Sequence, residues 1–82
     1  KPDFLPARIN LVSTLFISGH FDEALAGGQA VLKDNPNEYR MLYIVGEILL
    51  RKGDKENANK YFSKVSKIAP DFKQVRKHLS EQ

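Results

Sequence analysis

The sequence of 82 residues predicts an all-α protein built from a repeated helical hairpin. Two observations support this fold class. Apolar residues recur every three or four positions through four long segments, as in helices with one buried face. The chain also resembles itself when it is shifted by 34 residues. Because no segment alternates apolar and polar residues as a strand does, we expect five helices and no sheet.

The internal similarity rests on six aligned pairs of residues. They are Leu15 with Leu49, Gly19 with Gly53, Ala24 with Ala58, Val31 with Val65, Lys33 with Lys67 and Pro36 with Pro70. One further step backwards from Pro36 reaches Pro2, so we expect residues 1–4 to be the end of a preceding unit and the chain to be part of a longer array. The chain then divides into units at residues 5–38 and 39–72 and a last segment at residues 73–82.

The first unit is predicted to hold two helices, at residues 7–18 and about 21–33. Gly19 ends the first helix, because glycine readily takes the left-handed conformation that a helix C-terminus needs. Acidic Asp22 favours the start of the second helix through the helix dipole, and Pro36 follows its end.

The second unit repeats this plan. Its first helix is predicted to open at residue 37 or 38 and to run to residue 52, where Gly53 stops it. Asp54 is a good N-cap for a second helix to about residue 67, and Pro70 closes that helix. A fifth, shorter helix is predicted over about residues 72–80.

A 34-residue unit of two helices with this pattern resembles the tetratricopeptide repeat, and the resemblance covers nearly the whole chain. The matching residues are Leu11, Gly19, Ala24 and Pro36 in the first unit and Leu42, Gly46, Gly53, Ala58, Phe62 and Pro70 in the second. The first unit departs from the family's pattern at Arg8, Val12 and Gly28. The resemblance implies an α-solenoid of two 34-residue helix-turn-helix repeats plus a C-terminal capping helix, five helices in all.

We expect residues 73–82 to cap the array because of the residues on the outer face of the second unit's second helix. In this family the second helix of a unit packs on the first helix of the next, through places that hold Leu25 and Leu32 in the first unit. The same places in the second unit hold Asn59 and Ser66. A polar outer surface is typical of the end of an array.

Small residues mark where helices are expected to cross closely. The resemblance places Ala24 and Ala58 at these crossings, so Ala58→Leu is expected to cost several kcal/mol by overpacking. Gly27 and Gly28 fall within a helix and indicate either close helix approach or local softness. They do not form a phosphate loop, because no strand precedes them and no Lys-Ser/Thr follows.

The resemblance implies a protein-protein interaction module that holds a protein or peptide partner in a concave groove, lined by the first helices of successive units. The groove candidates are Ile9, Asn10, Ser13, Phe16, Arg40, Tyr43, Ile44, Glu47, Gln74, Lys77 and His78. Tyrosine and arginine commonly anchor such interfaces. A carboxylate clamp for acidic chaperone tails is not expected, because Ile44 stands where a second cation belongs.

The basic residues gather in the second half of the chain. Residues 51–77 hold nine basic and three acidic residues, and Lys60, Lys64 and Lys67 share one helical face. This face is either a patch for an acidic partner or nucleic acid, or an ordinary solvated surface. Nucleic acid is disfavoured, because aromatic residues for base stacking are sparse there.

Enzymatic chemistry, a cofactor and a metal site are not expected. The chain has no Cys, and its two imidazoles, His20 and His78, lie in separate units. No apolar run approaches the roughly 20 residues that a membrane span needs.

Two alternative functions remain open at this point, and a contact between copies of the chain is also considered. The chain is alternatively an accessory, substrate-positioning domain of a larger enzyme or of a secretion or assembly machine. A related helical-repeat family binds single-stranded RNA, but Gly53, Pro36 and Pro70 fit the tetratricopeptide pattern better. Because the chain holds fewer than three full repeats, we expect it either to be only marginally stable alone or to self-associate through the face around Ala7, Leu11 and Thr14.

Overall fold

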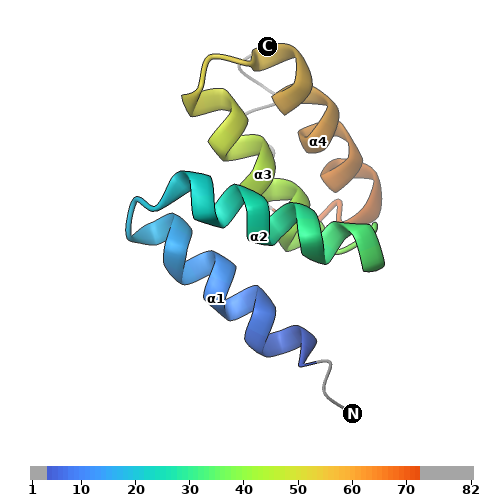
Figure 1. Ribbon diagram of the computed structural model, residues 1–82. Coiled ribbons are helices and arrows are strands. Elements are labelled where there is room, and N and C mark those ends of the chain that lie inside the picture. Colours follow the sequence, from blue (N-terminus) through green and yellow to red (C-terminus); the bar gives the residue numbers. More distant parts are fainter. Residues whose placement is uncertain (1–3, 73–82) are drawn as a thin grey trace.

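A computed structural model describes residues 4–72, which form four helices and, within that range, no strand (Figure 1). The helices are α1 (Leu5–Ile17), α2 (Phe21–Asp34), α3 (Tyr39–Arg51) and α4 (Lys55–Ile68). The all-α prediction is confirmed for this part of the chain, and each helix bound lies within two residues of the predicted one. The expected fifth helix and three groove candidates lie outside the described residues; those candidates are Gln74, Lys77 and His78.

The two hairpin turns are built in the same way. Gly19 and Gly53 have φ values of +86° and +87°, in the left-handed region that favours glycine. The same backbone hydrogen bond closes each turn, from His20 N–H to the Leu15 carbonyl at 2.8 Å and from Asp54 N–H to the Leu49 carbonyl at 2.9 Å. The shift of 34 residues thus holds in three dimensions for the turns as well as in the sequence.

Asp54 caps the N-terminus of α4, as predicted. Its carboxylate accepts hydrogen bonds from the backbone N–H of Asn57 at 3.3 Å and from the Asn57 side-chain amide at 2.8 Å. These bonds hold the pKa of Asp54 below its ordinary value, because they stabilise the charged form. The cap fixes the residue at which α4 begins.

Helix α3 joins the two halves of the core. Figure 1 shows α2 crossing between α1 and α3, while α4 packs on the other side of α3. Met41, Ile44 and Ile48 of α3 belong to the core cluster formed with α1 and α2. Leu42 belongs to a second cluster with α4, in which Phe62 is fully buried. One helix therefore supplies apolar surface to both hairpins.

The closest helix contacts show why the first unit departs from the family's pattern. In the second hairpin a small residue of α3 faces a large residue of α4: a Cβ at Gly46 would lie 2.7 Å from the Phe62 ring. In the first hairpin the sizes are exchanged, since a Cβ at Gly27 would lie 2.9 Å from a methyl group of Val12. A Cβ at Gly28 would lie 3.8 Å from Val12 and 3.1 Å from Val45 of α3, so the departures at Val12 and Gly28 lie at the same close helix crossing. Of the two readings of the paired glycines, the structure favours close helix approach.

Candidate partner-binding groove

A shallow hollow of about 300 Å³ lies between α1 and α3, and we call it the α1–α3 groove. Its lining residues are Ser13, Phe16 and Ile17 from α1, Arg40, Tyr43 and Ile44 from α3, and Phe72. Ile44 is 7% exposed and forms part of the floor, whereas Ile17 is 82% exposed at the rim. The hollow therefore combines apolar walls with three side chains that can form hydrogen bonds.

Most of the predicted groove residues that the structure describes meet in this hollow. They are Ser13, Phe16, Arg40, Tyr43 and Ile44. Ile9 does not reach it, because only 3% of its surface is exposed and it packs in the core. Asn10 is exposed on α1 but does not line the hollow, and Glu47 is buried beside it.

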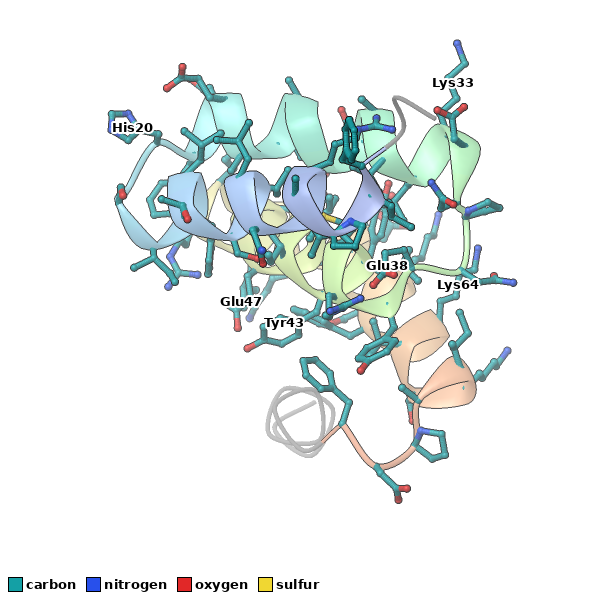
Figure 2. The ribbon with its side chains drawn as sticks, turned by 90° about the horizontal axis from the view of Figure 1, so that it is seen from below. His20, Lys33, Glu38, Tyr43, Glu47 and Lys64 are labelled. Atoms are coloured by element: carbon teal, nitrogen blue, oxygen red, sulfur yellow. The ribbon has the colours of Figure 1, made fainter. Side chains whose placement is uncertain are left out.

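The carboxylate of Glu47 is held by two neighbours on α3. The Tyr43 hydroxyl donates to Glu47 at 2.6 Å, and the Arg51 guanidinium donates to its other oxygen at 2.7 Å. Figure 2 shows Tyr43 and Glu47 on the same side of the molecule. These bonds satisfy the polar groups of a nearly buried acid and restrict the Tyr43 ring that lines the groove.

Arg51 is a contributor that the sequence analysis missed. Its guanidinium carbon lies 5.2 Å from the centroid of the Phe16 ring and 5.4 Å from that of Phe21, both from the first hairpin. Arg51 therefore links the two hairpins while it pairs with Glu47. The spacing of Tyr43, Glu47 and Arg51, one helical turn apart each time, was the available signal for this network.

Phe72 forms a wall of the groove from beyond the end of α4. Its ring stands edge-on to Tyr39, with centroids 5.2 Å apart, and edge-on to Tyr43, with centroids 5.1 Å apart. The Phe72 N–H also donates to the Ala69 carbonyl at 2.9 Å. This packing fixes the chain that follows α4 against α3.

Arg40 supplies the charge at the groove rim, and Glu38 partly neutralises it. The two carboxylate oxygens of Glu38 accept from the Arg40 guanidinium at 3.0 and 3.3 Å. The Glu38 side chain also accepts from the Arg40 backbone N–H and so caps α3. The rim therefore presents a guanidinium–carboxylate pair.

Tyr43 is expected to make the fold sensitive to high pH. Burial, followed by the hydrogen bond to Glu47, raises the pKa of the phenol above its ordinary value of 10.0. The folded state therefore holds the phenol proton more tightly, so this stabilisation is complete below pH 10 and is lost as the pH rises toward the folded-state pKa. We expect the free energy of unfolding, measured in urea at increasing pH, to fall less steeply above pH 10 in Tyr43→Phe than in wild type. Parallel curves would contradict this expectation.

Two further structural findings bear on the kind of site. Within residues 4–72 no group of three or more His, Cys, Asp or Glu side chains is placed to hold a metal ion. None of the four helices just described has the length and apolar character needed to cross a membrane.

The paired hairpins, their matching turns and the groove between their first helices define a helical-repeat protein. Residues 39–72 match the model of the tetratricopeptide repeat family, and this part of the chain is a tetratricopeptide repeat. The resemblance stated from the sequence is thereby confirmed for the second unit. No curated protein matches the chain. Tetratricopeptide repeats are typically non-catalytic interaction modules, so the family suggests protein partners.

Proposed function

We propose that the chain is a protein-protein interaction module that holds a segment of a partner protein in the α1–α3 groove. The observation that carries the proposal is the meeting of Ser13, Arg40 and Tyr43, which come from different hairpins, around one apolar hollow. Ligand sites in proteins commonly combine apolar walls with a few polar groups that fix orientation. The tyrosine and arginine are of the types that most often anchor interfaces.

The proposal includes the first hairpin as a divergent repeat of the same family, adjacent to the matched one. Its turn has the same positive φ at glycine and the same closing hydrogen bond as the matched repeat. The exchange of volume between Val12 on α1 and Gly27 and Gly28 on α2 supports a common ancestry of the two hairpins. It keeps the crossing of the two helices as close as in the matched repeat, but with different residues. Two adjacent repeats are the smallest unit that forms a groove between first helices.

The test starts from a partner segment selected without prior assumption. A phage-displayed library of random peptides is selected against the whole chain, and an enriched peptide is synthesised for calorimetry. Ile17→Lys is expected to weaken its binding about tenfold, since Ile17 is 82% exposed at the groove rim. The exposure of this side chain makes the substitution compatible with folding.

Leu11→Lys is the matched control for this experiment. Leu11 lies on the same helix and is 60% exposed, but it does not line the groove. We expect this substitution to change the affinity by less than about twofold. Equal losses in the two variants, or the absence of any enriched peptide, would count against the groove as the binding site.

A further inference from the structure

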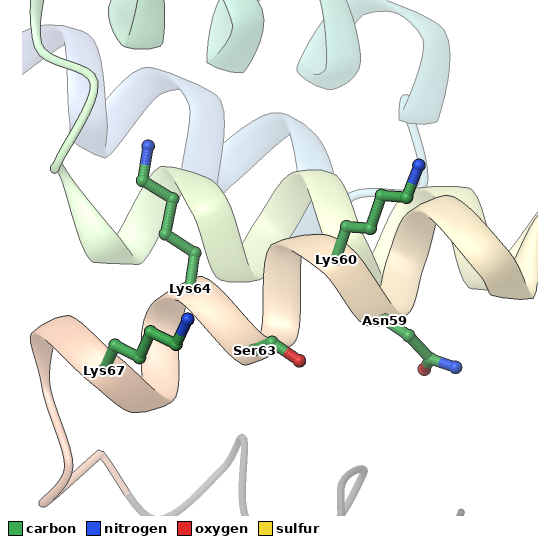
Figure 3. A pocket seen from close by; sticks show the side chains of 5 residues that line it. All are labelled: Asn59, Lys60, Ser63, Lys64 and Lys67. Atoms are coloured by element: carbon green, nitrogen blue, oxygen red, sulfur yellow. The ribbon is translucent and has the colours of Figure 1, made fainter.

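Helix α4 carries a row of exposed lysines. Lys60, Lys64 and Lys67 are exposed and follow one another at intervals of four and three residues. With Asn59 and Ser63 they line a surface hollow of about 590 Å³ (Figure 3). We call these five residues the lysine face, and none of them lines the α1–α3 groove. Two of the lysines, Lys60 and Lys64, also border a second surface hollow with Leu42 of α3.

Among the described residues no lysine of the lysine face forms a close ion pair; the same holds for Lys33 and Lys55, but only the lysines of this face lie together along one hollow. Four basic side chains on α1, on α3 and in the turn after α3 pair with acids: Arg8 with Asp34 at 3.9 Å, Arg40 with Glu38 at 3.0 Å, Arg51 with Glu47 at 2.7 Å and Lys52 with Asp22 at 2.7 Å. The positive charge of the lysine face is therefore left to solvent.

The stability of α4 accounts for only part of this arrangement. Lys67 lies in the last turn, where the helix dipole favours a cation. Lys60 attracts Asp54 at the start of α4 and helps to lower the pKa of that carboxyl, but Lys64, one turn later, repels Lys60. A ligand of opposite charge would relieve the repulsion between Lys60 and Lys64.

We propose that the lysine face is a second binding surface, which receives an acidic segment of a partner protein. The three lysines span about 10 Å along α4, so carboxylates spaced one turn apart on a partner helix can meet them in succession. The Asn59 amide and the Ser63 hydroxyl add uncharged groups that can donate to carboxylates. The lysine stems provide apolar walls for the methylene groups of glutamate.

A nucleic acid is the other occupant that a basic face suggests, and this face suits it less well. Tight nucleic-acid binding commonly rests on about six to ten phosphate contacts, whereas this face has three cations. Tyr61, which borders a hollow with Lys60 and Lys64, packs partly against the core cluster of α3 and α4, and one partly buried ring offers little surface on which successive bases could stack. An acidic polypeptide therefore fits the chemistry better than RNA or DNA.

The test measures the binding of a fluorescently labelled poly-glutamate peptide to the whole chain by anisotropy, at several salt concentrations. We expect binding that weakens as salt is added, because the contacts are exposed charges. Lys60→Gln combined with Lys64→Gln is expected to weaken binding about fivefold, and Lys60→Arg combined with Lys64→Arg is expected to preserve it.

The matched control is Lys33→Gln combined with Lys55→Gln, which removes the same charge from exposed positions outside the lysine face. We expect this variant to bind poly-glutamate within about twofold of wild type. The proposal is overturned if the control loses as much affinity as the lysine-face variant, if wild type does not bind poly-glutamate, or if labelled poly-uridine binds more tightly. None of these outcomes bears on the proposal that the α1–α3 groove binds a partner segment, because the groove variants are tested with a different peptide.

Discussion

Phe62→Ala is expected to lower the free energy of unfolding by about 3–5 kcal/mol. The Phe62 side chain is fully buried between α3 and α4, and its ring centroid lies 5.9 Å from that of Tyr43. The ring rests on Gly46, where a Cβ would lie only 2.7 Å away. Because Gly46 has no side chain that can move into the space, the cavity left by alanine stays largely unfilled.

Urea unfolding followed by circular dichroism measures this loss, with Phe4→Ala as the matched control. Phe4 is 63% exposed, so the same chemical change there is expected to alter stability by less than about 0.5 kcal/mol. If Phe62→Ala is unfolded in water, the smaller change Phe62→Leu gives a transition that can be measured. Equal stabilities of Phe62→Leu and wild type would show that the site is not tightly packed.

Local chemistry made the helices and turns predictable from the sequence. Gly19 and Gly53 each supply the left-handed residue that ends a hairpin's first helix, and Asp54 caps the N-terminus of α4. These effects act over a few neighbouring residues, so they can be read without knowledge of tertiary contacts. The helix ends accordingly lie within two residues of their predicted positions.

The exchange of volume between the hairpins was not predictable in the same way. Compared position by position with the family's pattern, Val12 and Gly28 read as two separate departures. Only the packed structure shows that a larger residue on α1 faces smaller ones on α2. In the second hairpin the small residue, Gly46, lies on α3 and the large one, Phe62, lies on α4. Compensation of this kind belongs to pairs of residues in contact, which a single sequence does not reveal.

The sequence named some of the residues that line the α1–α3 groove and omitted others. The family resemblance named Ser13, Arg40 and Tyr43, whose side chains line one hollow in the structure. It did not include Ile17, at the last residue of α1, or Phe72, beyond the end of α4, because residues at helix ends leave the regular pattern. The burial of Ile9 was also not predictable. Helical spacing places Ile9 on the side of α1 that faces α3, but only the packed structure shows that its side chain is buried.

Ala58→Leu is expected to destabilise the protein by about 3 kcal/mol or more through overpacking. Ala58 is fully buried in the cluster that contains Phe62 and Leu42, so the added carbon atoms have no free space. The equivalent Ala24 is also fully buried in the first hairpin, as expected for a close helix crossing. A larger side chain at position 58 would push α4 away from α3 and disturb the contacts of Phe62.

Ala26→Leu separates this packing effect from the change in helix propensity. Ala26 lies in α2 and is exposed, and leucine is nearly as good a helix former as alanine. We expect the control to melt within a few degrees of wild type and Ala58→Leu to melt far lower, or to be unfolded at room temperature. An unchanged melting temperature for Ala58→Leu would mean that α3 and α4 can separate at this crossing without cost. The close approach of Gly46 to Phe62 argues against such freedom.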